Sequence, residues 1–206
     1  LYNSMFIRLF NENPNPRDVR QIVEVLRNGG IIIYPTDTTY GLGCDIYNKK
    51  GIKKIFQIKQ RDSRKPFSFI CSDLAEISNY AQVSNFAFKI MKRHLPGPYT
   101  FVLDATKIVP DALSTKQKTV GVRIPENNIC QEIVRQLGHP LVTTSANISG
   151  EATPQDPQLI DAEMGRMVDM VIDGGISLGE ASTVISLVDD HIEVLREGSG
   201  DISWIE

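Results

Sequence analysis

The stretch Ile31-Ile32-Ile33-Tyr34-Pro35-Thr36-Asp37-Thr38-Thr39-Tyr40-Gly41-Leu42-Gly43 joins a short hydrophobic run to a run of hydroxyls and glycines. The hydrophobic run predicts a buried strand over 31–34, because Gly29-Gly30 ends a helical pattern just before it. We expect residues 35–43 to form a loop at the end of this strand. Polar side chains in that position commonly line a ligand crevice, although the same residue types also dominate ordinary turns.

The rest of the chain alternates between the periods of helices and strands. The pattern predicts helices over 17–27, 51–60, 86–94 and 129–137. It predicts strands over 31–34, 67–71, 99–103, 120–124, 141–144, 167–172, 183–188 and 192–196. Alternating elements indicate an α/β fold, and Asp189-Asp190 between the last two strands predicts an antiparallel hairpin. We therefore expect one domain over residues 1–206 with a mixed, twisted sheet, and its most loop-like segment at 151–157.

Composition excludes several classes of protein. The chain has 206 residues, of which 41% are hydrophobic, so it can bury a substantial core. No apolar run approaches the roughly 20 residues that span a bilayer, and the first residues lack a charged-then-apolar leader pattern. Three scattered cysteines without a C-x-x-C motif predict reduced thiols and a cytoplasmic protein without a zinc or disulfide framework. Cys44 and Cys71 lie among apolar residues and are predicted to be buried.

The net charge of −3 hides a strong asymmetry along the chain. Residues 1–150 carry 20 Lys and Arg against 12 Asp and Glu, whereas residues 151–206 carry 2 against 13. The densest basic stretch runs from Lys49 to Lys65. Such an asymmetry points to a polyanionic partner or substrate, and the alternative for Lys49 to Lys54 is a solvated helix face.

Beyond the loop over 35–43, three groups of residues could carry chemistry. Lys59 can act as a point charge on phosphate and Arg61 as a planar fork, although a cation also suits a helix C-terminus. Arg123 lies among apolar strand residues, so it either meets a core carboxylate or binds an anionic ligand. Ser145 and Asn147 follow another strand and fit either a site or a turn. The three histidines are scattered and predicted to face solvent, and there is no phosphate-binding glycine motif of the G-x-x-x-x-G-K-[ST] or G-x-G-x-x-G type.

Seven short motifs then occur in a recognisable order. They are Tyr-Pro-Thr-Asp-Thr-Thr-Tyr-Gly-Leu-Gly (34–43), Lys59-x-Arg61, Leu-Pro-Gly-Pro-Tyr-Thr (95–100), Val-Gly-Val-Arg-Ile-Pro (120–125), Ser145-x-Asn147 with Ser149-Gly150, Ser182-Thr183-Val184 and Leu-Arg-Glu-Gly (195–198). In this order the chain resembles the YrdC/Sua5/YciO family, the threonylcarbamoyl-AMP synthases of tRNA modification. The resemblance implies a YrdC-like α/β fold, with a twisted mixed sheet and flanking helices around a large basic cavity.

The resemblance also implies a reaction, in which L-threonine, bicarbonate and ATP give threonylcarbamoyl-AMP and diphosphate. By motif, the residues implied to hold L-threonine are Thr38, Arg123, Thr143 and Ser182. Those implied to contact ATP are Arg61, Lys65, Thr119, Ser145, Thr153 and Arg196. Lys59, Arg61, Ser145 and Asn147 are the implied catalytic set. Mg²⁺ is expected to arrive with ATP, and no permanently bound cofactor or separate metal site is expected.

Three positions depart from the family pattern. Asp62 replaces a common Pro, Ile70 stands where many members carry a His near the threonine, and Tyr99 replaces a common Leu. Two alternatives stay open. The departure at Ile70 motivates a YciO-like paralogue that acts on the adenylate, and the basic balance of residues 1–150 motivates a factor that binds tRNA or double-stranded RNA. The retained Lys-x-Arg and Ser-x-Asn signature favours the synthase. The proteins of a threonylcarbamoyl-transferase complex are then possible partners, and no association with a membrane is expected. The chain also ends soon after Arg196, as in the short members of the family.

Overall fold

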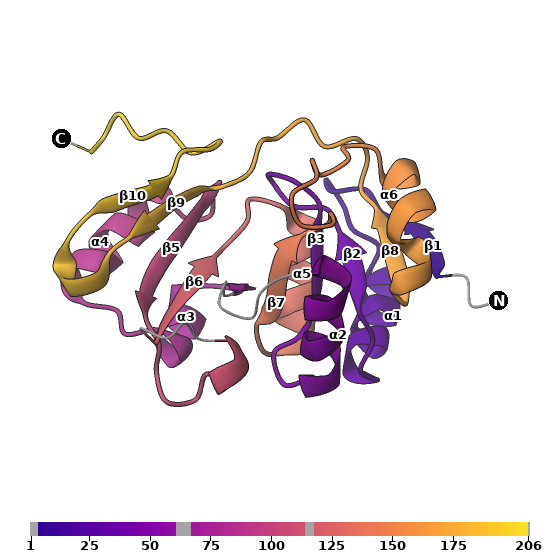
Figure 1. Ribbon diagram of the computed structural model, residues 1–206, viewed down its shortest axis with the longest axis horizontal. Helices are drawn as coiled ribbons and strands as arrows, with labels where there is room; N and C mark the ends of the chain where they lie inside the picture. Colours follow the sequence, from indigo (N-terminus) through magenta and orange to yellow (C-terminus); the bar gives the residue numbers. More distant parts are fainter. Residues whose placement is uncertain (1–3, 61–66, 114–117, 206) are drawn as a thin grey trace.

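The computed structural model describes residues 4–60, 67–113 and 118–205, which form one mixed sheet with helices on both faces (Figure 1). The ten strands are β1 (Met5–Arg8), β2 (Ile32–Tyr34), β3 (Gly41–Asp45), β4 (Ser68–Ile70), β5 (Tyr99–Asp104), β6 (Thr119–Arg123), β7 (Leu141–Ser145), β8 (Met170–Asp173), β9 (Thr183–Ser186) and β10 (Glu193–Arg196). Their order across the sheet is β1-β8-β2-β3-β7-β4-β6-β5-β9-β10.

Parallel and antiparallel pairs both occur, which confirms the predicted mixed α/β sheet. β8 pairs in parallel with β1 and β2, β4 with β6, and β5 with β9, while the remaining neighbours are antiparallel. The predicted hairpin is confirmed, because β9 and β10 are antiparallel partners on either side of Asp189 and Asp190.

In the part of the chain that the structure describes, six α-helices flank the sheet, and each begins after a residue that can cap it. They are α1 (Pro16–Arg27), α2 (Lys49–Lys59), α3 (Leu74–Tyr80), α4 (Asn85–His94), α5 (Asn128–Leu137) and α6 (Pro157–Met164). Their capping residues are Asn15, Asn48, Asp73, Ser84, Asn127 and Asp156, whose side chains all accept a hydrogen bond from the first turn. Short 3₁₀ turns lie at Asp111–Leu113, Gly165–Met167 and Val188–Asp190.

The two faces of the sheet are covered unequally. One face packs against α2, α3, α4 and α6 through a continuous cluster of buried side chains. On the other face, the buried side chains of α1 and α5 pack with β8, β2 and the ends of two central strands, Ile70 on β4 and Leu141 on β7. Beyond Ile70 and Leu141, the residues that share this face are mostly polar or glycine, and they lie over a hollow. The helices therefore cover half of this face and leave the other half open.

The expected loop over residues 35–43 is wrong in its second half. Gly41–Asp45 forms β3, which lies between β2 and β7 near the centre of the sheet. The two glycines of this strand hid it, because glycine lowers the strand propensity of a segment. The segment 151–157 was expected to be loop-like, and α6 begins at its last residue, Pro157. β1, α3 and α6 were not predicted, being short elements of four to eight residues.

The three cysteines are buried, and two of the three histidines pack against other side chains. All three cysteines are free and buried, as predicted for Cys44 and Cys71, and burial raises the pKa of the Cys44 thiol to about 12. The expectation that the histidines face solvent is wrong for two of them: His94 stacks on Trp204, and His139 lies 3.0 Å from an Asp45 carboxylate oxygen. Within the described ranges, no helix combines the length and apolar character needed to span a membrane.

Candidate functional site

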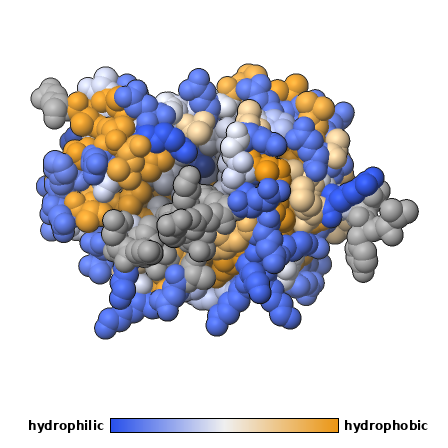
Figure 2. Space-filling model, viewed as in Figure 1, coloured by the Kyte–Doolittle hydropathy of each residue, from blue (hydrophilic) through white to orange (hydrophobic). Residues whose placement is uncertain are grey.

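A cavity of about 1130 Å³ lies over the open half of the sheet. Figure 2 shows a hollow near the centre of the molecule, with hydrophilic residues at its rim. Ten of the twelve residues predicted from the sequence line this cavity: Thr38, Lys59, Thr119, Arg123, Thr143, Ser145, Asn147, Thr153, Ser182 and Arg196. The other two, Arg61 and Lys65, lie outside the described residues. Among the described lining residues, three are cationic, namely Lys59, Arg123 and Arg196, and one is acidic, Glu193.

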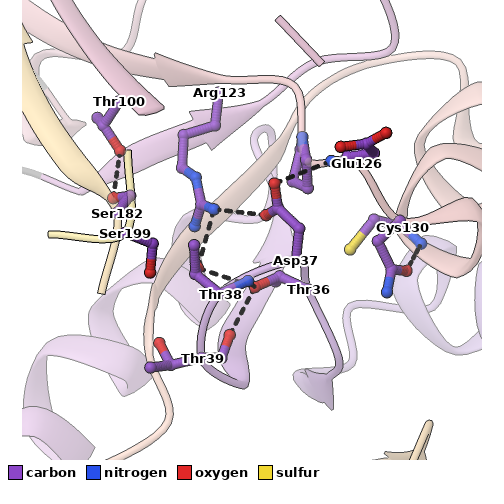
Figure 3. Close-up of polar contacts among 12 residues, drawn as sticks. Thr36, Asp37, Thr38, Thr39, Thr100, Arg123, Glu126, Cys130, Ser182 and Ser199 are labelled. Atoms are coloured by element: carbon purple, nitrogen blue, oxygen red, sulfur yellow. Dashed lines mark hydrogen bonds and ion pairs between the residues drawn. The ribbon is translucent and has the colours of Figure 1, made fainter. Parts of the chain in front are cut away.

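The buried guanidinium of Arg123, the last residue of β6, organises one end of the cavity. Its Nη2 donates to Asp37 Oδ1 and to Thr38 Oγ1, both at 2.9 Å (Figure 3). Asp37 also accepts a hydrogen bond from the backbone N–H of Glu126. Of the two alternatives for Arg123, the structure therefore shows the carboxylate partner. Its Nε, however, is buried and has no hydrogen-bond partner in the described part of the chain, so the hydrogen-bonding capacity of this guanidinium is not fully used.

The loop after β2 holds Thr38 in place beside Arg123. Thr36 Oγ1 accepts from the Thr38 backbone N–H at 3.0 Å and donates to the Thr39 carbonyl at 2.6 Å. Ser177, from the segment between β8 and β9, donates its hydroxyl to the Thr38 carbonyl at 2.6 Å. Thr38 is 2% exposed, so its hydroxyl has a fixed place at the cavity wall.

Ser182 and Arg196 form the wall on the side of β9 and β10. The Ser182 hydroxyl lies 2.8 Å from Thr100 Oγ1 on β5, and Arg196 donates from Nη2 to the Ser182 carbonyl at 2.8 Å. The pKa of Arg196 is lowered, chiefly by desolvation and then by the positive charge of Arg123. Two guanidinium groups thus influence the same part of the cavity, which favours an anionic ligand between them.

Lys59 is the last residue of α2, and its ammonium reaches across to the end of β7. Nζ donates to the carbonyls of Ser145 and Asn147, both at 2.7 Å, and to Asn147 Oδ1 at 2.5 Å. Ser145 Oγ lies 3.3 Å from Nζ and donates to Asn147 Oδ1 at 2.6 Å. Lys59 is 2% exposed, so this buried cation fixes the Ser-Ala-Asn turn that forms one cavity wall. Lys59 therefore does more than an ordinary cation at a helix C-terminus, because its ammonium binds a different segment of the chain.

Several cavity residues received no role from the sequence. Ser68, Thr100 and Gly121 form part of the cavity floor from β4, β5 and β6. A polar or small residue at alternate positions of an otherwise apolar strand is the signal that could have found them. Ile70, which departs from the family pattern, is fully buried among the side chains under α1 and α5 and pairs in register with Arg123.

Known proteins resemble this chain in sequence and in fold over most of its length. The family model described as "Telomere recombination", Sua5/YciO/YrdC, matches residues 24–198. The uncharacterized protein YciO of Escherichia coli K12 is 43% identical over 97% of this chain and 98% of that protein, and the crystal structure of E. coli YciO superposes with a TM-score of 0.93. A threonylcarbamoyl-AMP synthase of Vibrio vulnificus is 30% identical over 88% of this chain and 98% of its own.

A solved structure with a bound amino acid is also similar. The crystal structure of P. abyssi Sua5 complexed with L-threonine superposes with a TM-score of 0.89 at 29% identity. The match covers 95% of this chain and 58% of that chain. The likeness therefore extends over almost all of this protein and over the corresponding part of a longer one.

The arrangement of side chains favours some kinds of chemistry over others. No His or Cys is among the described residues that line the cavity, so its serine and threonine hydroxyls have no imidazole beside them there to act as a general base. Hydroxyls, amide groups and fixed cations predominate instead. Such a site binds anionic groups, places them and stabilises the charge that develops on oxygen.

Proposed function

Because the chain belongs to the Sua5/YciO/YrdC family, we propose that it is an L-threonylcarbamoyladenylate synthase, an enzyme of the nucleotidyltransferase class. The observation that carries this proposal is the Arg123 guanidinium in the cavity wall, held by Asp37 and Thr38 and without a partner at Nε among the described residues. A carboxylate suits this guanidinium, and the hydroxyls of Thr38, Thr143 and Ser182 line the same cavity. The carboxylate of L-threonine can bind the guanidinium, and its hydroxyl can bind the hydroxyls of the cavity.

The size and charge of the cavity support a second substrate beside the amino acid. A single small-ligand site occupies roughly 300–1,000 Å³, and this cavity measures about 1130 Å³. We assign the ATP end to Thr119, Ser145, Thr153 and Arg196, with Arg61 and Lys65 as predicted from the motif. Mg²⁺ enters as part of the nucleotide substrate, because Glu193 is the one carboxylate among the described lining residues.

The proposed reaction needs placement more than side-chain chemistry. Bicarbonate adds its carbon to the threonine amine with loss of water, which gives a carbamate. A carbamate oxygen attacks the α-phosphorus of ATP, and the bond to diphosphate breaks. Arg123 would hold the amino acid. The hydrogen bonds from the Lys59 ammonium, which we call the Lys59 clamp, would keep Ser145 and Asn147 in place beside the reacting groups. A positive environment then offsets the charge on the transferred group.

The direct test measures diphosphate release from the purified protein with ATP, Mg²⁺ and bicarbonate, with and without L-threonine. The synthase requires release that depends on both L-threonine and bicarbonate, with L-serine much weaker. Threonine-independent hydrolysis, or no release from a protein that binds ATP, would contradict the assignment.

A YciO-like paralogue is the second candidate, since the YciO relative at 43% identity exceeds the named synthase of Vibrio at 30%. Such a protein would act on the adenylate without forming it efficiently. Supplying threonylcarbamoyl-AMP directly separates the two: the paralogue would release AMP from it, while the synthase would run in reverse with diphosphate to give ATP.

Binding of RNA is a further candidate property and has its own structural basis. Lys49, Lys50, Lys53 and Lys54 are all exposed on α2, so the solvated helix face described from the sequence is present and is available to phosphates. Binding of tRNA or double-stranded RNA through such a face should weaken steeply as salt rises. An affinity that stays flat with salt would exclude it. A cytoplasmic location would suit each of these activities.

A further inference from the structure

We propose that Tyr34 is a positioning residue of the cavity, which fixes the hydroxyl of Thr143 so that Thr143 donates its own proton to the ligand. The phenol of Tyr34 donates to Thr143 Oγ1 at 2.5 Å. Tyr34 lies on β2 and Thr143 on β7, and β3 runs between these strands (Figure 1). The inference rests on the proposed function, in which Thr143 contacts L-threonine.

The two glycines of β3 make this long contact possible. Two strand spacings separate β2 from β7, roughly 10 Å, so the ring must lie across the strand between them. A Cβ atom at Gly41 would come within 2.8 Å of the Tyr34 ring and 3.1 Å of Thr143 Oγ1, and one at Gly43 within 3.2 Å of the ring. A side chain at position 41 or 43 would occupy the space of the phenol. Both glycines thus leave room for the phenol, and at Gly43 a Cβ atom would also meet the backbone carbonyl of Val142.

Burial determines the direction of the hydrogen bond. Tyr34 is 0% exposed, and Thr143 Oγ1 is the hydrogen-bond partner of its hydroxyl in the described part of the chain. Burial also raises the pKa of the phenol far above its ordinary value, so the proton stays on it. If the phenol accepted instead, its own proton would have no acceptor, at a cost of about 1–3 kcal/mol. The phenol therefore donates.

The consequence falls on Thr143. A hydroxyl has one proton, and Oγ1 of Thr143 uses a lone pair for the phenol, so its proton is left to point elsewhere. The described residues offer that proton no other partner, and Thr143 lines the cavity with 5% of its surface exposed. Thr143 is thus held as a donor toward the ligand. It suits a ligand oxygen with a free lone pair, such as a carboxylate or hydroxyl oxygen of the amino acid.

The test is a double-mutant cycle read by calorimetric binding of L-threonine. Tyr34→Phe removes only the phenol oxygen and frees Thr143 to turn its proton inward. We expect affinity to fall about 5- to 10-fold, the equivalent of one hydrogen bond. In a Thr143→Val background, Tyr34→Phe should have no further effect. Tyr80→Phe is the control, because it removes a phenol oxygen that is hydrogen-bonded to Tyr47 on the opposite face of the sheet, away from the cavity.

The outcomes separate this inference from the function on which it rests. Non-additive losses, with Tyr80→Phe unchanged and all variants folded by thermal denaturation, would support the positioning role. Equal affinity in the wild type and Tyr34→Phe, or losses that simply add, would overturn it while leaving the synthase assignment intact. A wild-type protein that binds no L-threonine would overturn the proposed function and this inference with it.

Discussion

Among the described residues, helices cover one half of one face of the sheet, and a cavity lies over the other half. The boundary between the two halves crosses single strands, between residues that are two positions apart. On β7, Leu141 lies under α1 and α5, while Thr143 lines the cavity. On β4, Ile70 is buried under the same helices, while Ser68 lines the cavity. Side chains two residues apart on a strand point to the same face of the sheet. The two members of each pair therefore differ in whether a helix packs over them, and they do not differ in the direction of their side chains.

The comparison shows how one sheet supplies both a core and a site. Where α1 and α5 pack, the strands carry Ile, Leu and Met, and burial of these groups stabilises the fold. Where the helices end, the same strands carry Ser, Thr and Arg, which gain no stability from burial unless they are paired. Polar residues on an inward face therefore mark the part of the sheet that is reserved for a ligand.

The largest expected effect comes from breaking the clamp that shapes the open half. Lys59→Met removes the ammonium that binds the carbonyls of Ser145 and Asn147. We expect threonine-dependent diphosphate release to fall by about 100-fold or more, because the turn loses its fixed geometry. Loss of the buried contacts should also cost about 1–3 kcal/mol of unfolding free energy.

The matched control for Lys59 lies on the same helix. Lys54→Met removes an exposed cation of α2, and we expect it to change catalytic rate by less than about twofold. Steady-state rates and urea unfolding of both variants measure the difference. Equal rates for Lys59→Met and the wild type would show that the clamp has no part in catalysis.

The second expected effect concerns the anionic end of the cavity. Arg123→Met should weaken L-threonine binding about 100-fold, since a charge-assisted hydrogen bond to carboxylate contributes about 1.5–3 kcal/mol. Asp37→Asn keeps the shape but removes the charge that orients the guanidinium, and we expect a loss of about 10-fold. Calorimetry with L-threonine measures both. An unchanged affinity in Arg123→Met would place the amino acid elsewhere.

These residues also show how far the sequence leads. The run from Ile31 to Tyr34 predicts its strand because it is short and apolar and follows Gly29-Gly30. β3 is missed because Gly41 and Gly43 weaken the local strand signal, and pairing with both neighbours determines its conformation. The cavity residues were predicted from motif resemblance, and the structure brings ten of them together while their roles remain proposals.

The contacts between cavity residues are harder to predict than the residues themselves. Tyr34 and Thr143 are 109 positions apart, and their contact depends on a strand order that does not follow the sequence. The Arg123 to Asp37 pair has the same origin: the residues are 86 positions apart and come from β6 and the loop after β2. Local patterns identify such side chains as unusual, but only the packed sheet determines their partners.

The third prediction tests the two halves directly on one strand. Ile70→Ala creates a cavity under α1 and α5 and should lower the unfolding free energy by about 2–5 kcal/mol. Ser68→Ala, two residues away, should change it by no more than about 0.5 kcal/mol. Urea unfolding measures both. Similar destabilisation by the two substitutions would show that the open half contributes as much to the core as the covered half.

The smallest expected effect is a pH dependence on the fully covered face, where His94 stacks on Trp204 and lies near Asp201 and Arg93. The pKa of His94 is lowered below 6.5, chiefly by burial, so the unfolded chain binds this proton more tightly than the folded one. The free energy of unfolding should therefore fall slightly as pH drops through 6.5, and change no further below the folded-state pKa.

A His94→Gln variant should lose that part of the pH dependence, which is small because the ring keeps partial contact with solvent. Urea unfolding of both proteins at pH 7.5 and 5.5 measures the difference. The affinity of wild type and variant for L-threonine should respond equally to pH, because His94 is not among the described residues that line the cavity. A ligand affinity that follows the titration of His94 would contradict the separation of the covered and open surfaces, since it would require the two faces of the sheet to be coupled.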